Sequence, residues 1–256
     1  MITTSDGVAL HLFDEGSGAP VVLIAGYGAP AAAWYLQVDA LRDEHRCISV
    51  DRRHHGRSGR PAYGHRMSRH AADVREVIDE LALRDVLLVG SSMGANVALS
   101  YVDLFGTSTL RGLVLVDQTP KMINEDDWEL GYVGLTRDGA EEWVGRFPEG
   151  VRALHVQPPA EVLVRTQDGP PFSVDDTRAL LRDHTFADWR DVVARVDVPV
   201  TAIAGRESPV WPWQSSAWLA ETAPDGHLVV IDDCGHAPMV EQPAAFNRAL
   251  REAAAR

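Results

Sequence analysis

Residues 86–98 read VLLVGSSMGANVA. The first four are β-branched or leucine and indicate a buried strand, whereas the small and apolar residues from Ala95 onward favour a helix. Between them lies a Gly-x-Ser-x-Gly motif centred on Ser92. A sharp strand-to-helix turn exposes the serine hydroxyl, and glycines on both sides remove side chains that would collide with neighbouring backbone. Ser92 is therefore predicted to be a nucleophile; the competing interpretation is a serine that only caps the helix.

Short apolar runs and helical stretches alternate along most of the chain. Strands are expected at 20–25, 46–50, 86–89, 113–116, 200–204 and 228–231, and helices at 31–42, 68–83, 95–105, 213–222 and 243–255. Near-continuous apolar strands are typical of a parallel sheet that is buried on both faces. The pattern predicts an α/β fold with a mostly parallel twisted sheet and helices on both faces. Residues 1–14 resemble a hairpin at an antiparallel edge.

The strand–helix rhythm stops between residues 120 and 197. This segment contains isolated aromatic residues, among them Trp128 and Trp143, and we interpret it as a mainly helical cap inserted into a core of residues 1–119 and 198–256. The aromatic side chains either line a substrate cavity or bury the cap against the core. Gly26, Trp128 and Trp143 are the candidate substrate-binding residues.

Composition excludes several classes of protein. The 256 residues include 24 Lys and Arg against 37 Asp and Glu, giving a net charge of −13, the wrong sign for binding nucleic acid. Cys47 and Cys234 lack the spacing of a disulfide framework or a metal site, so reduced thiols and no metal are expected. The N-terminus lacks the features of a signal peptide, and Gly and Pro interrupt the longest uncharged stretch. We expect a cytoplasmic monomer or homodimer with no membrane partner.

A base and an oxyanion hole have candidates at the ends of other strands. His236 follows the last predicted strand, where the carboxyl edge of a sheet would present its imidazole to Ser92. A turn at residues 26–28 follows the first buried strand, so the N–H groups of Tyr27 and Met93 are the expected oxyanion donors. An ordinary turn is the competing interpretation for these glycines. The histidines of the Arg-rich loop after Asp51 are expected at the surface; they are His54, His55, His65 and His70.

Four motifs, in order, resemble the α/β-hydrolase superfamily over almost the whole chain. They are Ala25-Gly26-Tyr27-Gly28, the loop from Asp51 to Gly59 (DRRHHGRSG), the Ser92 turn, and Gly235-His236-Ala237-Pro238 followed by Glu241-Gln242-Pro243. The resemblance implies an α/β-hydrolase fold, a lid formed by residues 120–197, and no metal or organic cofactor. It also implies a catalytic triad completed by an acid.

The expected acid departs from the family pattern. Gly-x-x-Asp usually follows the strand at 200–204, but this chain has Gly205-Arg206-Glu207-Ser208, with serine at the acid position. Some superfamily members that have a cap place the acid after the strand that follows the nucleophile helix. The corresponding strand of this chain, at 113–116, is followed by Asp117. Asp117 is the predicted triad acid. The alternatives are Glu207, another carboxylate such as Asp232 or Asp233, or no acid.

By this resemblance, the expected activity is serine-dependent hydrolysis of a small to medium ester or lactone through an acyl-enzyme. Carbon–carbon bond hydrolysis and cofactor-free perhydrolysis use the same triad and remain alternatives. A different class also remains, namely a ligand sensor or signalling protein with this fold. Turnover against stoichiometric binding distinguishes the sensor from the enzymes.

Overall fold

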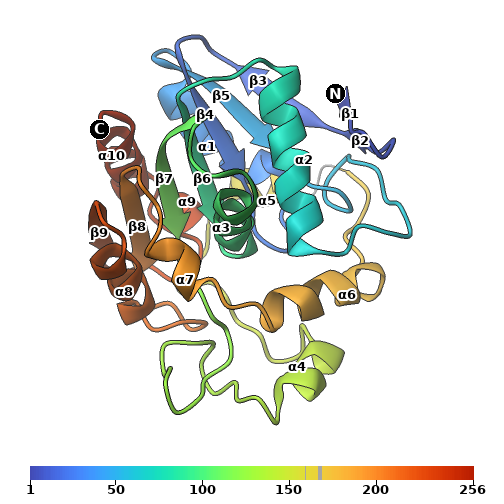
Figure 1. Ribbon diagram of the computed structural model, residues 1–256, viewed down its shortest axis with the longest axis vertical. Helices are drawn as coiled ribbons and strands as arrows, with labels where there is room; N and C mark the ends of the chain where they lie inside the picture. The colour runs from blue at the N-terminus through green and yellow to red at the C-terminus, as the bar shows by residue number, and fades with distance from the viewer. Residues whose placement is uncertain (159, 167–168) are drawn as a thin grey trace.

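The computed structural model describes residues 1–158, 160–166 and 169–256 and is built around a seven-stranded sheet (Figure 1). The order is β3-β5-β4-β6-β7-β8-β9, and all neighbouring pairs are parallel except β3 with β5. The strands are β3 (Leu12–Glu15), β4 (Ala19–Ile24), β5 (His45–Val50), β6 (Val86–Ser91), β7 (Leu110–Val116), β8 (Val200–Gly205) and β9 (Gly226–Ile231). The predicted mostly parallel sheet is confirmed.

Helices cover both faces of the sheet because its central strands are apolar on both sides. In β4, Val21 and Leu23 belong to one core cluster, whereas Val22 and Ile24 belong to the other. The first cluster is covered by η1 (Ala31–Trp34), α1 (Tyr35–Leu41) and α10 (Pro243–Ala254), with the short α9 (Pro238–Glu241) before α10. The second is covered by α2 (Met67–Glu80), α3 (Met93–Phe105) and α8 (Gln214–Thr222). Apart from the short α9, these are the helices that the sequence predicts.

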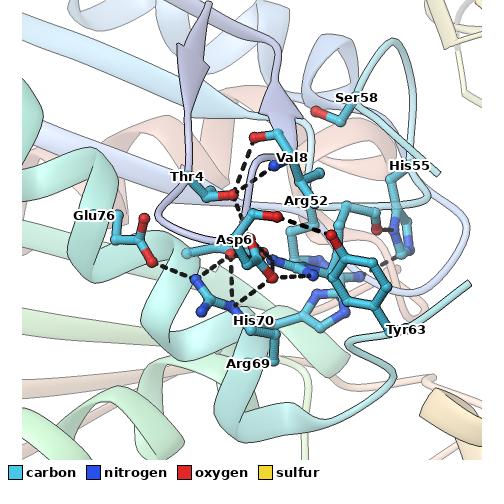
Figure 2. Close-up of polar contacts among 12 residues, drawn as sticks. Thr4, Asp6, Val8, Arg52, His55, Ser58, Tyr63, Arg69, His70 and Glu76 are labelled. Atoms are coloured by element: carbon cyan, nitrogen blue, oxygen red, sulfur yellow. Dashed lines mark hydrogen bonds and ion pairs between the residues drawn. The ribbon is translucent and has the colours of Figure 1, made fainter. Parts of the chain in front are cut away.

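The N-terminal residues form a small hairpin that ion pairs attach to the core. β1 (Ile2–Thr3) pairs antiparallel with β2 (Ala9–Leu10), and β3 then joins the edge of the main sheet. Asp6 in the hairpin turn accepts from Arg53, and Ser5 beside it donates to Glu76 on α2. Glu76 also accepts from Arg69 on the same helix (Figure 2). The network fixes the loop between β5 and α2 against the hairpin.

The segment between β7 and β8 lies across the carboxyl ends of the parallel strands (Figure 1). Its helices are α4 (Ala140–Arg146), α5 (Ala160–Thr166), α6 (Val174–Thr185) and α7 (Arg190–Val193). Within the described residues, all of the named elements of this segment are helices, and a long stretch without a helix, residues 117–139, precedes α4. Glycine and proline at positions such as Gly131, Gly134, Pro148 and Gly150 interrupt helical runs here.

Across the described ranges, no helix is both long and apolar enough to cross a membrane.

Candidate active site

Ser92 occupies a strained turn between β6 and α3. Its φ is +52°, a left-handed value that is rare for a residue other than glycine. A Cβ at Gly90 would collide with the backbone of Gly94, and a Cβ at Gly94 would collide with the backbone of Ile24. The Ser92 side chain makes no capping hydrogen bond to α3. The turn therefore presents the hydroxyl away from the helix, and the interpretation of Ser92 as a helix cap is wrong.

His236 joins Ser92 to Asp117. Its Nε2 lies 3.0 Å from Ser92 Oγ, and its Nδ1 lies 2.6 Å from Asp117 Oδ2. The His236 backbone N–H donates to Ala153 in the segment between β7 and β8, while the Trp211 ring packs edge-on against the imidazole at 5.7 Å. With Nδ1–H donated to the carboxylate, Nε2 is the nitrogen available to accept the serine proton.

Asp117 lies at the end of β7 with a φ of +42°, which turns its carboxylate toward the site. The side chain is buried. It accepts from His236, from Ser208 Oγ at 2.7 Å and from the Gly205 backbone N–H at 3.1 Å. Burial raises the pKa of this carboxyl, and the three hydrogen bonds act in the opposite direction. The charged form therefore depends on these donors.

The other carboxylates considered as the acid have different partners. Glu207 accepts from the Cys234 backbone N–H at 2.9 Å, and Asp232 pairs with Arg206. Neither is bonded to His236 in the part of the chain that the structure describes. The carboxylate bonded to His236 therefore follows β7, and position 208, after β8, has a serine. Nowhere in residues 1–158, 160–166 and 169–256 do three or more His, Cys, Asp or Glu side chains gather to hold a metal ion.

The expected oxyanion donors flank Ser92. A Cβ built on Gly26 would lie 3.0 Å from the Cβ of Ser92, so the Gly26–Tyr27 peptide passes directly beside the nucleophile. Met93 begins α3, where backbone N–H groups lack partners within the helix. Within the described residues, neither the Tyr27 nor the Met93 N–H donates to another protein group. Both donors are thus free to bind an oxyanion.

Two cavities meet at the site, and both include Tyr27, Ser92 and His236 in their walls. The first, of about 240 Å³, has mainly aliphatic walls that include Gly26, Trp34, Leu154, Val162, Met239 and Val240. The second, of about 140 Å³, has mainly aromatic walls that include Tyr132, Trp143, Phe147, Trp211, Leu181 and His184. Residues from the segment between β7 and β8 contribute to both cavities and cover Ser92.

Trp128 does not line either cavity among the described residues, which corrects the expectation that it binds substrate. Its indole N–H donates to the Lys121 carbonyl at 2.8 Å, and its ring packs edge-on against Trp218. Trp128 therefore attaches the segment to the core. Trp143, the other candidate, contacts Tyr132 and lines the aromatic cavity.

The predicted motifs gave no role at the site to Ser208, Trp211 or His184. Trp211 donates from its indole to the Asp117 carbonyl at 2.7 Å, and Ser208 donates to the Asp117 carboxylate. For Ser208 the signal was present, because a hydroxyl stood where the family has an acid. Trp211 and His184 are isolated in the sequence, and only the fold brings them to the site.

The histidines after Asp51 are not at the surface, so that expectation is wrong for three of the four. His54, His55 and His70 are buried, while His65 is half-buried. Burial is the largest cause of a lowered pKa at each buried ring, to about 4 for His54 and well below 6.5 for His55 and His70. The loop folds inward because His55 and His70 both bond to the buried Arg52.

Known proteins resemble this chain over nearly its whole length. A methyl ester esterase for pimeloyl-[acyl-carrier protein] from Vibrio cholerae is 28% identical, covering 97% of this chain and 99% of its own. A non-heme chloroperoxidase from Kitasatospora aureofaciens is 27% identical, covering 98% and 97%. The structure of an esterase from Exiguobacterium antarcticum matches with a TM-score of 0.86 at 25% identity, covering 98% and 97%.

The match to a known family covers most of the main sheet but leaves out the N-terminal hairpin and β3. Residues 21–249 match the alpha/beta hydrolase family, a span that runs from β4 to α10 and includes Ser92, Asp117 and His236. The chain therefore belongs to the alpha/beta hydrolase family.

Proposed function

We propose that the protein hydrolyses a neutral ester or lactone of small to medium size through an acyl-enzyme on Ser92. The observation that carries the proposal is the continuous chain from Ser92 Oγ to His236 at 3.0 Å and from His236 to Asp117 at 2.6 Å. The esterases among its relatives support the same chemistry. Asp117 is the proposed acid, and the Tyr27 and Met93 N–H groups are the proposed oxyanion donors.

The proposed reaction has two halves. His236 Nε2 accepts the Ser92 proton while Oγ attacks the carbonyl carbon, and the resulting oxyanion accepts from the two N–H groups. The tetrahedral intermediate collapses, and the imidazolium returns the proton to the departing alkoxide. Water then attacks the acyl carbon with His236 again as base, which releases the acid product and restores the Ser92 hydroxyl. Asp117 stabilises the imidazolium in both halves.

The walls of the two cavities support an uncharged substrate. Apart from histidine, the described residues that line them are apolar, aromatic or hydroxyl-bearing. Burial lowers the pKa of His184 to about 3, so this ring is neutral near neutral pH. An ionic group in either cavity would lose hydration without gaining a counter-charge. An ester with one apolar group in each cavity fits these walls, and residues 120–197 would act as the lid.

A second candidate is perhydrolysis, the formation of a peracid when hydrogen peroxide replaces water in the second half. The chloroperoxidase relative favours this alternative. The triad and the first half of the reaction are shared with ester hydrolysis.

The test is kcat/KM on a panel of chromogenic esters and lactones for the wild type, Ser92→Ala and Ser100→Ala. Ser100 is a buried serine on α3 outside both cavities, so it controls for loss of a serine alone. We expect turnover that disappears only in Ser92→Ala, and kcat/KM lower by about tenfold or more for esters that carry a carboxylate. Activity retained in Ser92→Ala, or no turnover of any ester by the wild type, would overturn the proposal. Adding hydrogen peroxide and measuring peracid distinguishes the second candidate.

A further inference from the structure

Arg52 is a buried arginine directly behind the proposed oxyanion hole. Its Nη2 donates to the Gly26 carbonyl at 2.8 Å, and its Nε donates to the Ala25 carbonyl at 3.2 Å. Its Nη1 lies 3.5 Å from the sulfur of Met93, the residue that supplies the second oxyanion donor. The side chain thus bonds to the peptide that carries the Tyr27 N–H and contacts the side chain of Met93, although it lies outside the substrate cavities.

The remaining partners of Arg52 are two neutral imidazoles. Nη1 lies 3.1 Å from His70 Nδ1, and Nη2 lies 3.0 Å from His55 Nε2 (Figure 2). Since a guanidinium only donates, both ring nitrogens must accept and therefore carry no proton. His55 Nδ1 donates to the Arg53 carbonyl, which agrees with that tautomer. Among the described residues, no carboxylate is hydrogen bonded to Arg52.

The neighbouring Arg53 has the opposite environment. It is equally buried, but its guanidinium donates to the carboxylates of Asp73 and Asp6. Its charge is therefore compensated within the protein. A buried cation without such a partner lowers stability. The charge of Arg53 is thus neutralised by bonded carboxylates, whereas the charge of Arg52 is not. Arg52 interacts with Asp73 only through space, and its guanidinium donates instead to the Gly26 carbonyl beside the proposed oxyanion hole.

We propose that Arg52 is a positioning residue that fixes and polarises the Gly26–Tyr27 peptide, so that the Tyr27 N–H binds the oxyanion more strongly. The inference rests on the proposed function. The Gly26 carbonyl and the Tyr27 N–H belong to one planar peptide unit, so a cation bonded to the oxygen fixes the direction of the N–H. Withdrawal of electron density at the oxygen also strengthens the N–H as a donor.

Charge supplies a second contribution in the same direction. The guanidinium is in a water-poor interior, where electrostatic interactions are weakly screened. The substrate carbonyl is neutral, whereas the tetrahedral intermediate carries a full negative charge. A fixed cation behind the hole thus stabilises the transition state more than the bound substrate, which raises kcat without changing KM.

The experiment compares Arg52→Met and Arg52→Lys with the matched control Arg53→Lys. Three quantities are measured: kcat and KM on a neutral chromogenic ester, the melting temperature, and the inhibition constant of an alkyl trifluoromethyl ketone. That ketone adds to the serine and places a hemiketal oxyanion in the hole, so it reports the oxyanion contacts directly. Lysine at position 52 keeps the charge but cannot reproduce the fork that reaches both carbonyls.

We expect kcat to fall by about tenfold to a hundredfold in Arg52→Met, less than the loss of a whole oxyanion donor, with a smaller fall in Arg52→Lys. Affinity for the ketone should fall by the same factor while KM changes little. Arg53→Lys should lower the melting temperature and leave kcat within about twofold. Equal kcat in the Arg52 and Arg53 variants, or a rise in KM alone, would overturn the inference.

Two further outcomes separate this inference from the proposed function. If Arg52→Met does not fold, the comparison of Arg52→Lys with Arg53→Lys decides the question on the same criteria. If the wild type binds the ketone but hydrolyses no ester, the proposed function fails, and the ketone affinities of the variants still decide the role of Arg52. A wild type that does neither overturns both.

Discussion

Ser208 Oγ donates a 2.7 Å hydrogen bond to Asp117 Oδ2, the same oxygen that accepts from His236. Ser208 occupies the position after β8 where the family pattern has its acid. In this chain that position donates a hydrogen bond to an acid at the end of β7 instead of supplying the acid itself. The hydroxyl favours the charged carboxylate, because this bond opposes the rise in pKa that burial causes at Asp117.

We predict that Ser208→Ala lowers kcat/KM by about tenfold, since a hydrogen bond to a charged group contributes about 1.5 kcal/mol or more. Loss of the donor raises the pKa of Asp117 further, so the carboxylate becomes protonated at a higher pH. The acidic limb of the pH–rate profile should therefore move to higher pH. Ser215→Ala is the control, because Ser215 is buried and its Oγ has no hydrogen-bond partner among the described residues. A limb that stays in place or moves to lower pH contradicts the prediction.

Asp117→Asn should lower kcat by about 10⁴-fold, the effect of this change in a Ser-His-Asp triad, because the amide favours the wrong imidazole tautomer. Glu207→Gln is the matched control. Its carboxylate accepts from the Cys234 N–H rather than from His236, so kcat should change far less. Kinetics on one ester for both variants decide the matter, and the reverse ranking would move the acid to Glu207.

The sequence predicted the strands and the positions of Ser92 and His236 because these depend on local pattern. Apolar runs define the strands, and each of these two residues lies just past the end of one. The prediction of Asp117 depended in addition on the resemblance to capped α/β hydrolases, because the local pattern left several carboxylates open. Local sequence pattern therefore identified the residues that lie at the carboxyl edge of the sheet.

Burial in loops was not predictable in this way. His54, His55 and His70 lie in a stretch rich in Arg and Gly, which is typical of a surface loop. His55 and His70 accept from the buried guanidinium of Arg52, a contact that no local pattern in the sequence reveals. The roles of Trp128 and Trp143 were likewise undecided by sequence, since only the fold determines which indole reaches the cavity.

Buried neutral histidines predict loss of stability in acid. The pKa of His184 is lowered to about 3 and that of His54 to about 4, both chiefly by burial, and His55 and His70 are shifted in the same direction. Because the folded-state pKa lies below the unfolded value of about 6.5, the unfolded chain binds more protons in the interval between them. The free energy of unfolding should therefore be highest above about pH 6.5 and fall as the pH decreases.

Each such histidine contributes a slope of about 1.4 kcal/mol per pH unit within its interval. His184→Gln should therefore reduce the slope of unfolding free energy against pH by the contribution of one histidine. The new glutamine side chain at position 184 still gives Gln118 a polar neighbour. Urea denaturation at a series of pH values from about 7 to 4 measures this. An unchanged slope in the variant would show that His184 does not carry one of these protons.

Trp128 and Trp143, two of the tryptophans between β7 and β8, should have different effects on substrate binding and on stability. Trp143 is part of the aromatic cavity wall, so Trp143→Ala should raise KM by about tenfold, equivalent to about 1.4 kcal/mol, with a smaller change in kcat. Trp128 is buried against Trp218 and bonded to Lys121, so Trp128→Ala should reduce the free energy of unfolding by about 3–5 kcal/mol. Each variant is the control for the other. Steady-state kinetics and denaturant titrations of both variants test the distinction. If Trp143→Ala instead loses kcat while KM stays unchanged, the indole stabilises the transition state rather than the bound substrate, which contradicts the prediction.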